Sequence, residues 1–194
     1  MSSYGKPGAR DAIEGRAAIH LPDMSDVPSA IRHCDGCTMC CRVMGIAELD
    51  KPAGVWCPHA VVGRSCRIYE ARPTECRTFN CLYLLDEELD ERWKPSEAKF
   101  CIVRDAGKKR LIAYMDPHRP DAWRREPYHS QFRAWAREAA PLGRQVIIGI
   151  GERRIALLPD REIDLGRVGP EDFIVTQRTA RGWEAFVEKR EPVA

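Results

Sequence analysis

Cysteine is the residue type with the clearest chemical potential in this chain. Eight of the nine cysteines fall within 48 residues, and four of them lie in the run Cys34-Asp35-Gly36-Cys37-Thr38-Met39-Cys40-Cys41. A deprotonated thiol is a strong ligand for soft and borderline metal ions. Such a concentration of thiols is typical either of a metal site or of a disulfide framework.

The rest of the sequence favours metal over disulfides. A chain of 194 residues with 44% hydrophobic residues can bury a core of its own and does not need disulfides to fold. Residues 1–16 contain no apolar segment of the kind that a secretory signal needs, so we expect a cytoplasmic protein. Disulfides are rare in that compartment, and nine cysteines cannot all pair with one another.

The spacing of the thiols indicates how they could share metal. Two-residue gaps let neighbouring thiolates converge on one ion or cluster. The adjacent pair Cys40-Cys41 predicts two metal centres, or one polynuclear centre, because neighbouring side chains rarely face the same ion. Eight thiolates would satisfy two four-coordinate sites. The predicted ligands are Cys34, Cys37, Cys40, Cys41, Cys57, Cys66, Cys76 and Cys81.

The spacing leaves zinc and iron both open. Many [4Fe–4S] proteins use a triple Cys-x2-Cys-x2-Cys run, whereas the second two-residue knuckle of a zinc ribbon is missing here. Closed zinc sites that hold a loop-rich module together are the alternative. His33 and His59 stand next to predicted ligands, and either could replace a thiolate. Cys101 lies outside the cluster in a predicted strand, and we expect a buried, inert thiol there.

The cysteine pattern resembles the YkgJ-type cysteine-cluster family of zinc- or iron-chelating domains. The resemblance covers residues 34–81 and includes Cys57-Pro58, the segment Cys66-Arg67-Ile68-Tyr69-Glu70-Ala71-Arg72-Pro73 and the segment Glu75-Cys76-Arg77-Thr78-Phe79-Asn80-Cys81. It implies metal chelation by the eight cysteines. The motif is also similar to that of flagellin lysine N-methylases, which implies an iron–sulfur cluster.

The elements that must position these thiols follow from hydrophobic periodicity. Strands are predicted at 100–103, 111–114, 146–150, 154–158, 173–176 and 183–187, and a helix at 131–140. Tyr128, Phe132, Trp135, Ala136 and Ala139 would share one face of that helix. We expect an α+β protein: a loosely ordered N-terminal segment (1–30), a loop-rich cysteine-cluster metal module (31–97), and a small α+β region (98–194) whose small antiparallel sheet carries one clear helix.

These observations lead to three hypotheses about function. The first is a metal-binding protein that chelates zinc or iron through the eight cysteines, with a [4Fe–4S] cluster as one form of the iron. The second is a metal- or cluster-dependent enzyme, such as a protein lysine N-methyltransferase or a redox enzyme. The third is an RNA- or partner-binding module that uses residues 101–154, where 12 Lys and Arg face 6 Asp and Glu.

Composition limits the third hypothesis and the range of partners. The net charge of +2 implies no global attraction to nucleic acid, and a solvated basic face is the simpler interpretation of residues 101–154. No apolar run approaches the roughly 20 residues that span a bilayer, so no membrane partner is expected. Metal ions are the partners that the sequence predicts.

Overall fold

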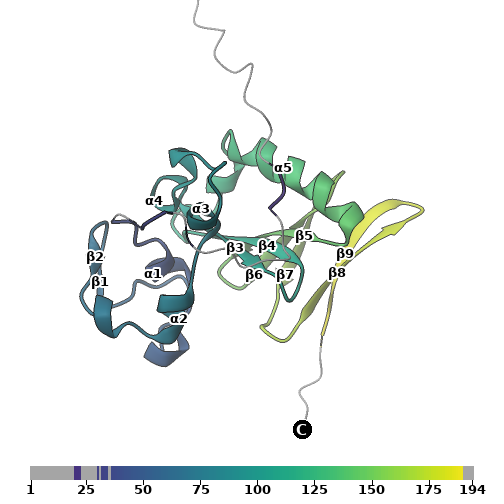
Figure 1. The fold of residues 1–194 in the computed structure, drawn as a ribbon. Coiled ribbons are helices and arrows are strands. Elements are labelled where there is room, and N and C mark those ends of the chain that lie inside the picture. Colours follow the sequence, from purple (N-terminus) through teal and green to yellow (C-terminus); the bar gives the residue numbers. More distant parts are fainter. Residues whose placement is uncertain (1–19, 23–29, 31, 35, 190–194) are drawn as a thin grey trace, which may run out of the picture.

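The computed structural model describes residues 20–22, 30, 32–34 and 36–189. Figure 1 shows the cysteine-rich part at one end, a sheet in the middle with a long helix on one face, and a two-stranded hairpin at the other end. The prediction of a loosely ordered segment over residues 1–30 falls largely outside the described residues. The predicted α+β class is confirmed.

The central sheet has five strands in the order β3-β4-β5-β6-β7, and the hairpin β8-β9 forms a separate two-stranded sheet. The strands are β3 (Phe100–Asp105), β4 (Arg110–Met115), β5 (Gln145–Ile150), β6 (Arg153–Leu157), β7 (Glu162–Arg167), β8 (Phe173–Thr179) and β9 (Gly182–Glu188). All six predicted strands are present. Strand β7 was not predicted, because its alternation of Ile163 and Leu165 with polar residues is short and is followed at once by Gly166.

One strand pair departs from the antiparallel sheet that the sequence predicts. Strands β4 and β5 run parallel, whereas β3–β4, β5–β6 and β6–β7 are antiparallel. Two parallel neighbours need a crossover connection, and helix α5 (Tyr128–Ala139) lies in that connection. The crossover places α5 on one face of the sheet (Figure 1).

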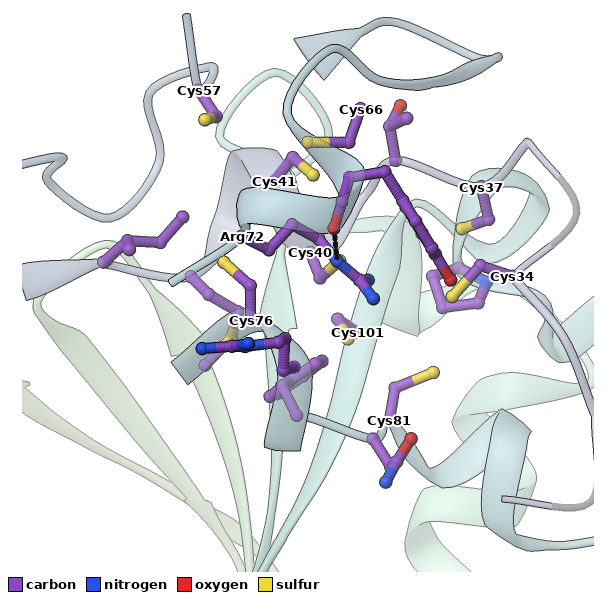
Figure 2. A pocket seen from close by; sticks show the side chains of 18 of the residues that line it. Cys34, Cys37, Cys40, Cys41, Cys57, Cys66, Arg72, Cys76, Cys81 and Cys101 are labelled. Atoms are coloured by element: carbon purple, nitrogen blue, oxygen red, sulfur yellow. Dashed lines mark hydrogen bonds between the residues drawn. The ribbon is translucent and has the colours of Figure 1, made fainter. Parts of the chain in front are cut away.

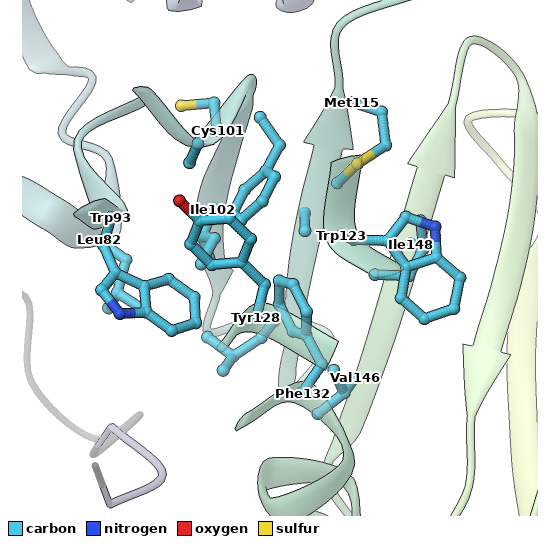
Figure 3. Close-up of a cluster of buried hydrophobic side chains, with 14 of the residues drawn as sticks. Leu82, Trp93, Cys101, Ile102, Met115, Trp123, Tyr128, Phe132, Val146 and Ile148 are labelled. Atoms are coloured by element: carbon cyan, nitrogen blue, oxygen red, sulfur yellow. The ribbon is translucent and has the colours of Figure 1, made fainter. Parts of the chain in front are cut away.

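Helix α5 buries the face that its sequence predicts. Tyr128, Phe132, Trp135, Ala136 and Ala139 are all buried, as expected from their spacing. The rings of Phe132 and Trp135 lie 5.6 Å apart, and Phe132 lies 5.5 Å from Phe100 of β3. Figure 3 shows Tyr128 and Phe132 of the helix in one buried cluster with Ile102 and Val146 of the strands. Packing of this kind fixes β3 and α5 as a rigid base.

The pleat of the sheet decides which side chains of β3 face α5. Phe100 and Ile102 belong to the large core under the helix. The opposite face of the sheet carries Ile112 and Ile147, which pack against the β8-β9 hairpin. By alternation Cys101 faces away from Phe100 and Ile102, but it belongs to the same buried cluster as they do.

The cysteine-rich part is built from short elements and loops, as predicted. They are α1 (Cys40–Val43), η1 (Ala47–Leu49), β1 (Ala60–Val61), β2 (Ser65–Cys66), η2 (Tyr69–Ala71), α2 (Thr74–Thr78), α3 (Leu82–Leu85), η3 (Glu91–Trp93) and α4 (Pro95–Ala98). Two further 3-10 turns, η4 (Ala122–Arg124) and η5 (Ala140–Leu142), flank α5. Helices α1, α3 and α4 contact β3, so the module rests on the edge of the sheet.

A continuous core crosses from the cysteine module into the sheet. Met39 and Val43 of the module share one buried cluster with Leu82, Phe100 and Ile148. Arg32 adds a polar anchor, because its guanidinium donates to the backbone carbonyls of Tyr83 at 3.1 Å and Leu89 at 2.7 Å. Over the described residues, none of the helices has both the length and the apolar character to span a bilayer.

Candidate metal centre

All nine cysteines line a single cavity of about 760 Å³. Figure 2 shows the nine sulfurs around this cavity, with the side chain of Arg72 among them. The cavity lies between the loops of the cysteine module and the edge of the sheet, because Cys101 of β3 also lines it. The eight predicted ligands are therefore brought together, and Cys101 joins them.

The run from Cys34 to Cys41 curves around one side of the cavity. A tight turn forms where the Cys37 N–H donates to the Cys34 carbonyl at 2.8 Å. Gly36 sits in this turn at a φ of 78°, and a Cβ there would meet the Gly63 carbonyl oxygen at 3.1 Å. Only glycine accepts both the positive φ and the close approach without strain, so Gly36 lets the first two thiols turn inward.

Backbone pairing fixes three of the later cysteines. The Cys57 N–H donates to the Cys41 carbonyl at 2.9 Å, which holds those two residues side by side. Cys66 pairs with Ala60 in the β1–β2 hairpin. Cys76 lies in α2, where its N–H donates to the carbonyl of the N-cap residue Pro73 at 3.0 Å.

The last two cysteines come from the side of the sheet. Cys81 stands immediately before α3, and Cys101 is the second residue of β3. Their side chains form a hydrogen bond with each other. Both are buried, Cys81 at 7% exposure and Cys101 at 0%. Cys81 and Cys101 thus form a buried, hydrogen-bonded pair of thiols that lines the cavity.

The electrostatic contacts between sulfurs group the predicted ligands into two sets that overlap at Cys41. Burial raises the pKa of Cys76, and the charges of Cys41, Cys57 and Cys66 raise it further. These four residues are called the second cysteine set (Cys41, Cys57, Cys66 and Cys76).

The remaining four predicted ligands also interact with one another. Burial raises the pKa of Cys34, and the charges of Cys81, Cys37 and, from the second set, Cys41 add to the effect. The charges of Cys34 and Cys37 likewise contribute to the raised pKa of Cys40. These residues are called the first cysteine set (Cys34, Cys37, Cys40 and Cys81).

The adjacent pair Cys40-Cys41 joins the two sets. A hydrogen bond from Cys40 lowers the pKa of Cys41 to about 7, against the effect of burial, and the charge of Lys51 assists. The same hydrogen bond, together with burial, raises the pKa of Cys40 well above its ordinary value. The hydrogen bond thus holds Cys40 as the thiol and favours the thiolate form of Cys41.

The pKa of a second cysteine, Cys81, is also lowered, which favours its thiolate form. The hydrogen bond from Cys101 lowers the pKa of Cys81, although burial opposes it, and the backbone N–H groups of Tyr83 and Leu84 lower it further. Each cysteine set therefore contains one sulfur that is electrostatically prepared to bind a cation: Cys41 in the second set and Cys81 in the first.

Two cations lie close to the sulfurs. Lys51 is only 6% exposed, and its Nζ donates to the carbonyls of Arg42, at 3.1 Å, and of Met44 at the end of α1. Burial lowers the pKa of Lys51, and the charges of Cys57 and Cys41 oppose this shift. The charge of Arg72 acts on cysteines of both sets, including Cys34 and Cys76. These cations offset part of the negative charge of clustered thiolates.

The state of the sulfurs bears on the choice between metal and disulfides. All nine cysteines lie in the described part of the chain, and all nine are free. Among the described residues, no group of three or more His, Cys, Asp or Glu side chains already has the arrangement that holds a metal ion. His33 and His59 also line the cavity.

Several arginines of the stretch 101–154 bind groups of their own chain. Arg124 pairs with Glu162 at 2.8 Å, and Arg153 pairs with Asp164. Arg133 donates to backbone carbonyls, that of Leu158 among them at 3.0 Å.

Cys101 is buried in the core, as expected. Sequence reasoning missed that it also lines the cavity. Comparisons of this chain with protein-family models, with curated proteins and with solved structures found no match.

Proposed function

We propose that this protein is a cytoplasmic metal-binding protein that chelates zinc or iron through its cysteine cluster. The single observation that carries the proposal is the cavity into which eight clustered cysteines and Cys101 all project. Free thiols gathered in one place, each set with a sulfur whose pKa is lowered, form a donor set suited to soft and borderline cations.

The two cysteine sets support two centres rather than one. Each set supplies four sulfurs, which is the number that a structural zinc ion or a [4Fe–4S] cluster takes from protein. The sets meet at Cys40 and Cys41, whose shared peptide bond keeps the centres adjacent. When bound, the metal would stabilise the loops of residues 36–81 and, in the case of iron–sulfur clusters, could carry electrons.

The experiment is metal analysis of the full chain, purified without oxygen, together with its visible absorption spectrum. We expect stoichiometric metal. Iron with inorganic sulfide and a brown colour would identify clusters, and zinc in a colourless protein would identify closed thiolate sites. A folded protein that carries no metal, or one whose cysteines are joined as disulfides, would refute the proposal.

A second candidate function is a cluster-dependent enzyme, either a redox enzyme or a protein lysine N-methyltransferase. The observation that favours it is again the cavity, whose volume falls within the range of small-molecule sites. Tyr69 is 56% exposed at its border, and the guanidinium of Arg72 stacks on that ring at 3.6 Å. Binding of a substrate should then perturb the visible spectrum of the loaded protein, whereas a purely structural centre would give no change.

A further inference from the structure

Arg72 presents a guanidinium of fixed orientation to the cavity. Its Nε donates to the Tyr69 carbonyl at 2.8 Å, and the guanidinium stacks on the Tyr69 ring at 3.6 Å. Figure 2 shows the side chain of Arg72 among the sulfurs. Within the described part of the chain, its two terminal nitrogens, Nη1 and Nη2, donate to no protein group. A guanidinium held in this way offers a fork of N–H donors that matches two oxygens of a carboxylate or a phosphate.

Two more arginines, Arg64 and Arg77, line the same cavity without an acidic partner. Both side chains are exposed. Over the described residues, neither guanidinium takes part in an ion pair or a hydrogen bond. An arginine side chain that binds nothing in its own chain keeps all of its N–H donors for a ligand.

The cavity holds little carboxylate charge that could balance these arginines. Glu75 is the one acidic side chain among the described residues that line it. The Glu75 Oε2 accepts the Ala47 N–H at 2.9 Å, so this carboxylate binds backbone and not an arginine. A fourth lining arginine, Arg32, is itself bound to backbone carbonyls. The positive charge of the other three arginines is therefore not balanced by a carboxylate at the cavity.

The arginines lie nearer to solvent than most of the sulfurs do. Arg64 and Arg77 are exposed, whereas every cysteine except Cys34 is half-buried or buried. The cavity thus has a thiol-rich inner part and an arginine-lined mouth. Metal bound to the thiols and an anion bound to the arginines would use different atoms, so both can be held together.

We propose that the mouth of the cavity binds a small anion through a carboxylate or phosphate group, which Arg72 holds through Nη1 and Nη2 while Arg64 and Arg77 complete the site. Arg72 is central because its orientation is fixed before the anion arrives, which lowers the entropic cost of binding. The place of the anion beside a metal centre rests on the proposed function, whereas its binding by the arginines does not. The inference gives the cysteine cavity a class of ligand or substrate besides metal.

The test is isothermal titration calorimetry of the full chain, purified without oxygen, with inorganic phosphate and separately with succinate. The ionic strength is held constant, so that a change in screening does not alter the measured affinity. We expect at least one of the two probes to bind with a Kd of about 1 mM or tighter. Tighter binding of phosphate would identify a phosphorylated ligand, and tighter binding of succinate would identify a carboxylic acid.

Three variants decide whether Arg72 recognises the anion. Hydrogen bonds to charged groups typically change affinity by about 10–100-fold, so Arg72→Gln should weaken binding by at least about 10-fold. Arg72→Lys should weaken it nearly as much, because lysine keeps the charge but lacks the fork. Arg67→Gln is the matched control, because Arg67 is exposed in the same segment but does not line the cavity. We expect its affinity to stay within about 2-fold of the wild type.

Two further variants keep the test decisive if Arg72→Gln does not fold. Arg64→Gln and Arg77→Gln alter exposed, unpaired side chains, so neither should affect folding. Each should weaken binding of the anion by about 2–10-fold. Wild-type affinity in both would contradict the inference.

Three other results would overturn it. They are the absence of binding of either probe up to about 10 mM, an equal loss of affinity in Arg72→Gln and Arg67→Gln, and wild-type affinity in Arg72→Lys. The last would mean that Arg72 acts only as a charge that offsets the thiolates. Metal content is measured on the same samples. A metal-free protein that binds the anion would refute the proposed function alone, and a metal-loaded protein that binds no anion would refute this inference alone.

Discussion

The substitution Asp116→Ala tests how the cysteine module is held on the sheet. Arg42 of α1 and Asp116, which follows β4, form an ion pair with an Nε–Oδ1 distance of 3.0 Å, and each side chain is only 10% exposed. The Arg42 guanidinium also lies 5.1 Å from the Trp56 ring. The Asp116 carboxylate accepts a second hydrogen bond from the His118 N–H at 2.9 Å.

The expected cost follows from the burial of this pair. Removing one partner of a buried ion pair leaves the other charge uncompensated and typically costs about 3–5 kcal/mol. The Arg42 Nε–H has no well-aligned hydrogen-bond acceptor, so the pair is held mainly by charge. We therefore expect the lower end of the range, and Asp116→Ala should reduce the free energy of unfolding by about 3 kcal/mol.

The assay is urea denaturation of the apoprotein, so that metal release adds no second transition. Asp105→Ala is the matched control, because the Arg110–Asp105 pair has the same 3.0 Å distance but 31% exposure at the carboxylate. We expect a loss of about 1 kcal/mol there. The double variant Arg42→Met with Asp116→Leu should be close to wild type. A loss below about 1 kcal/mol for Asp116→Ala would show that the reasoning from burial is wrong.

Three further outcomes are expected. In the apoprotein, the rate of alkylation of Cys41 should rise with pH and reach half of its maximum near the pKa of about 7. The reason is that the reactive thiolate is lost as the pH falls below that value. Cys40, whose pKa is raised, should stay unreactive. If Cys41 reacts only above about pH 8.5, the ordinary range of a thiol, its hydrogen bond with Cys40 is not formed. Trp135→Ala should lower the free energy of unfolding by about 3–5 kcal/mol in urea, since the ring is fully buried, and a loss below about 1 kcal/mol would contradict that burial. Metal removal should abolish hydrogen-exchange protection in residues 37–81 but leave residues 100–157 protected, and equal loss in both would show that the sheet depends on the metal.

The predictable part of the fold is the part whose signal is local. The buried face of α5 follows from the spacing of Tyr128, Phe132 and Trp135, because apolar residues three and four positions apart must share one side of a helix. The hairpin strands β5 and β6 follow from two apolar runs around Gly151, which adopts a φ of 57° in the turn. Neither prediction needs knowledge of a distant partner.

The parts that were not predicted depend on distant contacts. The parallel pairing of β4 with β5 is set by the crossover through α5, and no residue within either strand encodes it. Lys51 gives another example, because a lysine is normally a surface residue and nothing in its neighbours predicts 6% exposure. It is buried because carbonyls at the end of α1 accept its hydrogens.

In the candidate site, too, some features follow from the local sequence and others depend on distant contacts. Grouping of the eight cysteines in one cavity follows from their concentration in the sequence, since short loops bring neighbouring thiols together. The division into two sets of four does not follow from spacing. Cys34 and Cys81 are far apart in the sequence, yet they interact within one set. Arg32, two residues before Cys34, donates to the carbonyl of Tyr83, two residues after Cys81, and this hydrogen bond brings the two segments together.

Helix α1 contributes a cysteine to each of the two sets, whereas the β1–β2 hairpin contributes to one set alone, and this difference can be tested. Cys66 lies in the β1–β2 hairpin and belongs to the second set alone. Cys66→Ser should therefore remove about half of the bound metal, because only one of two four-sulfur centres loses a ligand. The ion pair at Arg42 instead holds α1, which carries Cys40 and Cys41 and so contributes to both centres. Asp116→Ala should consequently weaken both centres together. Equal metal loss from Cys66→Ser at both centres would mean that all eight sulfurs bind a single polynuclear group.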